Sequence, residues 1–137
     1  MSRLPNRKTL SKLTRICLDL IDVPVSRAKH FSFVMDGPKI ICMGYNNGWK
    51  THPSSKKFGH RYNATHSELH AINCFPYPIA ELNHYDLINI RVRPPASPEG
   101  ILGLAAPCRQ CRSLLSVFQP RRVFYSCNDQ SFQESEV

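Results

Sequence analysis

The sequence has no long hydrophobic run. Its longest nearly apolar stretches, residues 40–43 and 101–106, are far shorter than the ~18 apolar residues that a helix needs to cross a bilayer. The basic residues Arg3 and Arg7 are not followed by an apolar block that ends in small residues, so no secretory signal is predicted. We therefore expect a cytoplasmic protein that makes no contact with a membrane.

Acidic residues and low-complexity segments are also scarce. The 137 residues include 10 Asp and Glu against 18 Lys and Arg, and the formal net charge of +8 favours anionic partners such as nucleotides or nucleic acid. With 42% hydrophobic and 20% charged residues, the composition excludes wholesale disorder. Length and composition predict one globular domain over residues 1–137.

Six cysteines would suffice for three disulfides. A core of this size needs no cross-links and nothing in the sequence suggests export, so we expect thiols or thiolates. Four of them lie in apolar stretches, where a cysteine acts as a small hydrophobic core residue. These four are Cys17, Cys42, Cys74 and Cys127. The other two, Cys108 and Cys111, follow Pro107 and form a C-x-x-C pair, which makes them candidates for chemistry.

The hydrophobic pattern predicts alternating helices and strands. Apolar residues recur every three or four positions over about 9–22, which predicts a helix. Two β-favouring runs, 30–35 and 39–45, flank a turn sequence at 36–38 and predict a hairpin. The later segments are a helix at 66–75, a strand at 85–92, a proline-rich connector at 93–106, a helix after Pro107 and a fourth strand at 122–127. The alternation predicts an α/β fold, a three-layer α/β/α sandwich with a mixed central sheet.

Residues 46–65 are polar and basic and have no periodic apolar face. A loop of this length in a small domain is usually functional or mobile. Its cations fit a phosphate clamp as well as they fit a solvated loop. These cations are Lys50, Lys56, Lys57 and Arg61. His52 and His60 are either solvated or bind a second ion, and Tyr45 and Trp49 either pack on the core or stack on a base.

Two short motifs together carry the groups of a catalytic zinc site. They are H-x-E at 66–68 and P-C-x-x-C at 107–111. Catalytic zinc takes three protein ligands and keeps a fourth position for water, and His66, Cys108 and Cys111 supply that set. Alone, the cysteine pair fits a redox pair or a structural zinc site equally well. Combined with H-x-E it predicts bound Zn²⁺, with the sulfurs at a helix N-terminus that favours thiolates.

Glu68 lies two positions after His66, where its carboxylate reaches the water at the fourth zinc position without becoming a ligand. We therefore predict that Glu68 is the catalytic general base. His70 shares the helical face of His66, but a fourth protein ligand would block the water position. We expect His70 not to bind the metal.

The pattern H-x-E followed by P-C-x-x-C resembles the zinc-dependent cytidine and deoxycytidylate deaminase superfamily. The order of the predicted elements over about 9–127 resembles that family as well. The run Gly44-Tyr45-Asn46 is similar to the Gly-Tyr-Asn turn of deoxycytidylate deaminases. The resemblance implies a cytidine-deaminase-like fold, a hydrogen bond from Asn46 to the sugar hydroxyl of the substrate, and one from the backbone N–H of Ser67 to the pyrimidine O2.

These observations predict an enzyme, a zinc-dependent hydrolytic deaminase that converts a cytosine nucleotide, with dCMP preferred, to the uracil nucleotide and ammonia. Two alternatives stay open: a deaminase of cytosine or adenine in single-stranded DNA or RNA, and an inactive nucleic-acid-binding module stabilised by zinc. We also expect a homo-oligomer, because a chain that ends soon after its fourth predicted strand leaves a sheet edge to be covered.

Overall fold

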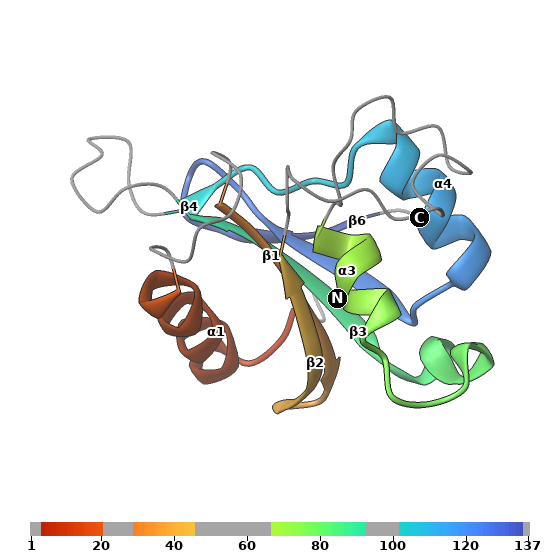
Figure 1. The fold of residues 1–137 in the computed structure, drawn as a ribbon. Helices are drawn as coiled ribbons and strands as arrows, with labels where there is room; N and C mark the ends of the chain where they lie inside the picture. Colours follow the sequence, from red (N-terminus) through yellow and green to blue (C-terminus); the bar gives the residue numbers. More distant parts are fainter. Residues whose placement is uncertain (1–3, 21–28, 46–66, 93–101, 136–137) are drawn as a thin grey trace.

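The computed structural model describes residues 4–20, 29–45, 67–92 and 102–135. Its elements, in chain order, are α1 (Arg7–Asp19), β1 (Lys29–Asp36), β2 (Lys39–Tyr45), α3 (Ser67–Asn73), the 3₁₀ helix η1 (Ile79–His84), β3 (Asp86–Val92), β4 (Leu102–Gly103), α4 (Arg109–Phe118), β5 (Arg122–Ser126) and β6 (Phe132–Ser135). Figure 1 shows their arrangement.

The described strands form one mixed, open sheet. The order is β2-β1-β3-β5-β6, and the short strand β4 pairs with the C-terminal end of β3. β1 is antiparallel to β2 and β3, β5 is antiparallel to β6, and β3 and β5 are parallel. A parallel pair needs a crossover connection, and α4 lies in that connection. The N-terminus of α4 therefore lies near the C-terminal end of β3.

Helices cover both faces of this sheet (Figure 1). On one face, Leu13 and Cys17 of α1 pack against Phe31, Phe33 and Phe124 of the strands. On the other face α3 and α4 pack on the sheet, and the buried residues there include Val34, Leu69, Ala71, Ile72, Leu87, Leu114, Leu115 and Val123. No helix in this described part of the chain is long and apolar enough to span a membrane. The described elements thus have the α/β class and the mixed sheet that the sequence predicts.

The alternation of side chains along β1 and β3 explains which residues meet α3. In β1, Ser32 lies between Phe31 and Phe33, which face α1, so Ser32 faces α3. In β3, Asn89 alternates in the same way with Ile88. Ser32 and Asn89 are partners in the antiparallel register. Two polar side chains therefore lie next to each other under α3.

The predicted first helix and hairpin are confirmed. α1 begins at Arg7, earlier than predicted, because the Asn6 side chain caps it: Oδ1 accepts the backbone N–H of Lys8 at 2.7 Å. β1 and β2 form the hairpin, and its turn contains Gly37 with a φ of 57°, a conformation that favours glycine. Local sequence signals thus predicted both features, although the start of α1 depends on the Asn6 cap, which the prediction did not include.

Two strands and one short helix lie where the sequence predicts none. η1 follows α3, and β4 lies within the predicted connector, where it pairs with β3. β6 pairs with β5 from Val123↔Ser135 to Ser126↔Phe132. The prediction that the strand at 122–127 is the last is therefore wrong. Among the described strands, β6 covers the edge of β5, and β2 and β6 lie at the two edges of the sheet.

β2 and α3 approach each other so closely that only glycine fits at position 44. A Cβ atom on Gly44 would overlap the backbone nitrogen of Ala71 and lie 2.7 Å from the carbonyl carbon of His70. These are backbone atoms of α3, and they cannot rotate away as a side chain would. Gly44 therefore sets the distance between β2 and α3.

We predict that Gly44→Ala lowers the free energy of unfolding by about 1–3 kcal/mol or more, because overpacking at a rigid contact forces the backbone to shift. Gly103→Ala is the matched control, since the nearest atoms to a Cβ there belong to the flexible side chain of Arg91. Urea denaturation of both variants measures the difference. Equal stability of the two would contradict the close contact between β2 and α3.

Candidate functional site

α3 and α4 are neighbours on one face of the sheet, and both begin near the same edge (Figure 1). Their first turns carry residues of the two predicted motifs. Ser67 and Glu68 begin α3, and Cys108 and Cys111 lie at the start of α4. The fold therefore brings together chemical groups from distant parts of the sequence.

The cysteine pair occupies the N-terminus of α4. Cys108 is the N-cap residue, and its sulfur accepts the backbone N–H of Cys111 at 3.4 Å. Cys108 is half-buried, whereas Cys111 is fully buried. The Cys108 side chain thus turns back toward the helix, and both sulfurs belong to its first turn.

Glu68 lies close to this pair. The pKa of the Cys111 thiol is raised above its ordinary value by a hydrogen bond with the Cys108 side chain, then by burial, and then by the charge of Glu68. These effects act against the helix N-terminus, which the sequence predicts to favour the thiolate. The hydrogen bonds that the Cys111 thiol makes with the side chains of Cys108 and Glu68, which both raise its pKa, form only at short range, so the two sulfurs and the Glu68 carboxylate lie near one another. A divalent cation bound by the two sulfurs would stabilise their thiolate forms.

The third expected zinc ligand, His66, directly precedes α3 and lies outside the described residues, as does Asn46. Within the ranges that the structure describes, no group of three or more His, Cys, Asp and Glu side chains is arranged to hold a metal ion. The loop residues with two open roles also lie outside these ranges. They are Trp49, Lys50, His52, Lys56, Lys57, His60 and Arg61.

The Glu68 carboxylate is held in a ring of four side chains. Glu68 is only 7% exposed; its Oε1 accepts from the Ser67 hydroxyl at 3.2 Å, and its Oε2 accepts from Nδ2 of Asn89 at 3.3 Å. Oδ1 of Asn89 accepts from the Ser32 hydroxyl at 2.7 Å. The Ser32 and Ser67 hydroxyl oxygens, 2.8 Å apart, close the ring. All four residues are buried, and they come from α3, β1 and β3.

The ring accommodates both protonation states of Glu68. A hydroxyl has one proton, and Ser32 donates its proton to Oδ1 of Asn89, because an amide oxygen can only accept. When the carboxylate is ionised, Ser67 donates to Glu68, and no proton then lies between the Ser32 and Ser67 oxygens. When Glu68 is protonated, it donates to Ser67, and Ser67 donates to Ser32. Rotation of one hydroxyl therefore lets Glu68 take up a proton without leaving a ring member unpaired.

Sequence reasoning missed Ser32 and Asn89. A polar residue between apolar ones in a strand is ordinarily expected to face solvent. The available signal was that Val34 and Leu87, which share a face with Ser32 and Asn89, are apolar as well. A polar residue in a strand with apolar residues on both faces indicates a buried polar contact.

His70 joins α3 to β2. Its Nδ1 accepts the backbone N–H of Tyr45 at 3.0 Å and lies 3.1 Å from the Tyr45 carbonyl oxygen. The Tyr45 ring packs edge-to-face on the imidazole, with ring centroids 4.8 Å apart. These contacts give His70 a structural role. They also show that Tyr45 packs within the fold, which was one of its two open roles.

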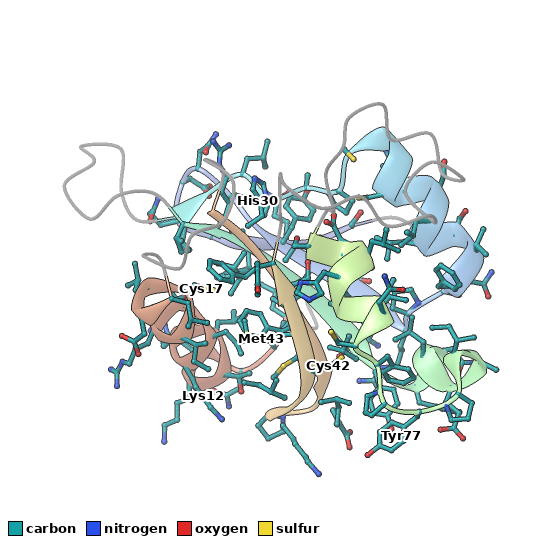
Figure 2. The ribbon with its side chains drawn as sticks, in the orientation of Figure 1. Lys12, Cys17, His30, Cys42, Met43 and Tyr77 are labelled. Atoms are coloured by element: carbon teal, nitrogen blue, oxygen red, sulfur yellow. The ribbon has the colours of Figure 1, made fainter. Side chains whose placement is uncertain are left out.

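All six cysteines lie within the described residues and none of them forms a disulfide, as predicted. Cys17 lies between α1 and the sheet (Figure 2), and burial raises the pKa of its thiol. Cys127 is also buried, and Cys42 is half-buried. Cys74 is exposed, so its predicted place in the core is wrong. It follows the last residue of α3, beyond the part of the helix that packs on the sheet.

No family model, no curated protein and no solved structure matches the chain. The site is therefore interpreted from its own residues and motifs.

We predict that His70→Ala lowers the free energy of unfolding by about 1–3 kcal/mol, because it leaves the partly buried N–H of Tyr45 without its acceptor. The zinc content should not change. His84→Ala, at an exposed position in η1, is the control and should shift stability by no more than about 0.5 kcal/mol. Urea denaturation and elemental analysis provide both readouts. Loss of zinc at unchanged stability would make His70 a metal ligand.

Proposed function

We propose that the protein is a zinc-dependent hydrolytic deaminase that converts a cytosine nucleotide, with dCMP as the preferred substrate, to the uracil nucleotide and ammonia. One observation carries this proposal: the buried carboxylate of Glu68 lies beside the Cys108 and Cys111 sulfurs at the start of α4. The H-x-E and P-C-x-x-C motifs to which these residues belong provide independent support.

The donor set fits zinc. Two thiol sulfurs on one helical turn are soft ligands of the kind that zinc prefers, and neutral imidazole is its usual nitrogen ligand. Cys108, Cys111 and His66 would hold the ion. When bound, zinc would supply a Lewis acid that makes water a good nucleophile at neutral pH.

Glu68 would move the protons of the reaction. Its carboxylate takes a proton from the attacking water and delivers it to N3 of the cytosine ring as the water oxygen bonds to C4. Glu68 then takes the second proton from that oxygen and passes it to the amino group. The bond between C4 and this nitrogen breaks, and ammonia leaves. The ring with Ser67 fits this role, because it accepts Glu68 in both protonation states.

Charge supports a phosphorylated substrate. The net charge of +8 and the four cations of residues 46–65 would stabilise a 5′-phosphate, which a free nucleoside lacks. By resemblance, Asn46 would bind the sugar hydroxyl, and the backbone N–H of Ser67 would bind the pyrimidine O2. A turn that grips the hydroxyl of one sugar leaves little space for a polynucleotide, so we favour the mononucleotide. The same net charge also favours a single-stranded polynucleotide, which is the second candidate substrate.

We predict that the purified protein holds about one zinc per chain, as a site with one His and two Cys ligands requires. The variant Cys108→Ala/Cys111→Ala should lose it. Cys127→Ala removes another buried cysteine and should retain the metal. Elemental analysis, with circular dichroism to confirm folding, measures the effect. Undiminished zinc in the double variant would exclude the assigned ligands.

We predict that wild-type protein deaminates dCMP faster than cytidine or deoxycytidine, and that Glu68→Gln slows turnover at least about 100-fold, the typical contribution of general acid–base catalysis. The zinc content should not change. Glu134→Gln makes the same substitution at an exposed position and should keep full activity. The assay follows loss of cytosine absorbance with cytidine, deoxycytidine, dCMP, dCTP and a cytosine-containing single strand.

The other outcomes of this assay identify the alternatives. Turnover of the single strand but not of dCMP would make the protein a polynucleotide deaminase, and its activity should then fall steeply with salt. Zinc binding without turnover of any substrate would support a binding module. Wild-type turnover in Glu68→Gln would refute the proton transfers assigned to Glu68.

A further inference from the structure

Asn89 and Ser32 introduce polar groups into the most buried part of the sheet. Asn89 is 2% exposed and Ser32 is fully buried. Burying a polar group costs free energy unless its hydrogen bonds are made, so each of these side chains needs a specific partner. The ring supplies one at each end of Asn89: the Ser32 hydroxyl donates to its Oδ1, and Glu68 accepts from its Nδ2.

The orientation of the Asn89 amide is determined by this arrangement. An ionised carboxylate can only accept hydrogen bonds, so Nδ2 must face Glu68. A flipped amide would place Oδ1 against the carboxylate oxygen, where two acceptors repel each other. The Ser32 hydroxyl further stabilises the observed orientation, because it donates to Oδ1. Asn89 is therefore a directed donor toward one oxygen of Glu68.

This donor limits the motion of Glu68. A glutamate side chain has several rotatable bonds, and an unrestrained carboxylate would sample many positions. Contacts from Ser67 to one oxygen and from Asn89 to the other restrict both ends of the carboxylate. Ser67 adjoins Glu68 in α3 and moves with it, whereas Asn89 belongs to a central strand of the sheet. Asn89 thus fixes the position of the Glu68 carboxylate relative to the sheet.

We propose that Asn89, oriented by Ser32, is a positioning residue that holds the Glu68 carboxylate beside the Cys108 and Cys111 pair. The inference rests on the proposed deaminase function, in which Glu68 handles the protons of the reaction. It adds that the reaction depends on two residues outside both sequence motifs. Since they act on Glu68, they should affect turnover more than substrate binding.

The test compares four variants with wild-type protein on dCMP. Asn89→Ala removes the donor, and Asn89→Leu removes it while it keeps the number and the branching of the side-chain heavy atoms. Ser32→Ala removes only the hydroxyl that orients Asn89. Ser126→Ala is the matched control, because Ser126 is equally buried and its hydroxyl also makes two hydrogen bonds, with the backbone N–H of Arg91 and the carbonyl of Gly103. Each protein is measured for kcat, KM, zinc content and stability in urea.

We expect both Asn89 variants to lose about 10- to 100-fold in kcat, since small misplacements of a catalytic group have effects of this size, with KM changed by no more than about twofold. The loss of kcat in Ser32→Ala should be smaller than in the Asn89 variants. Ser126→Ala should lose stability but keep the wild-type kcat, and all variants should retain zinc. A purely structural role would instead make the loss of kcat follow the loss of stability and would let Asn89→Leu recover activity.

Three results would overturn the inference. The first is a kcat for Asn89→Leu equal to that of Ser126→Ala, which would leave the proposed function intact. The second is an unchanged kcat in Ser32→Ala, which decides against the inference if the Asn89 variants do not fold. The third is wild-type protein that deaminates none of the cytosine substrates, which would refute the proposed function and this inference together.

Discussion

The burial of one carboxylate determines how this face of the sheet is built. Glu68 lies under the first turn of α3, and a buried carboxylate is stable only where hydrogen-bond donors surround it. Ser67 provides one donor from the helix, and Asn89 provides another from the sheet. Asn89 in turn needs a donor for its own oxygen, and Ser32 on the paired strand supplies it. Each polar residue in the ring is thus required by the one before it.

The ring could not form if α3 lay at another height above the sheet. Gly44 allows β2 to approach the backbone of α3, and the contact between His70 and Tyr45 joins the two elements where β2 ends. The ring fastens the same helix to β1 and β3. Contacts on two sides therefore determine where α3 lies, and its neighbour α4 carries Cys108 at a first turn close to Glu68. Helix packing therefore positions the described part of the candidate site.

Features that depend on residues close together in the sequence could be predicted, whereas features that depend on residues far apart in the sequence could not. α1 and the hairpin depend on apolar spacing, a cap and a turn glycine, which are all local, and they were predicted well. β6 was missed because it has a single large apolar residue, Phe132, and its strand conformation depends on pairing with β5. The motifs identified Glu68 and the cysteines because each motif is compact. Asn89 escaped prediction because its partners Ser32 and Glu68 are distant in the sequence: the apolar residues around it indicate a buried polar contact, but only the fold identifies the partners.

Stability alone does not explain why Ser32 and Asn89 are polar. On the α1 face of the same strands, Phe31, Phe33 and Ile88 form a wholly apolar cluster. Apolar side chains in place of Ser32 and Asn89 would need no hydrogen bonds, and replacing both partners of a buried polar pair by groups of similar shape is often neutral or stabilising. The pair therefore contributes little that packing could not supply, apart from a donor directed at Glu68. Departures from an apolar core are expected where function requires them, and here the departure lies under the carboxylate that faces the cysteine pair.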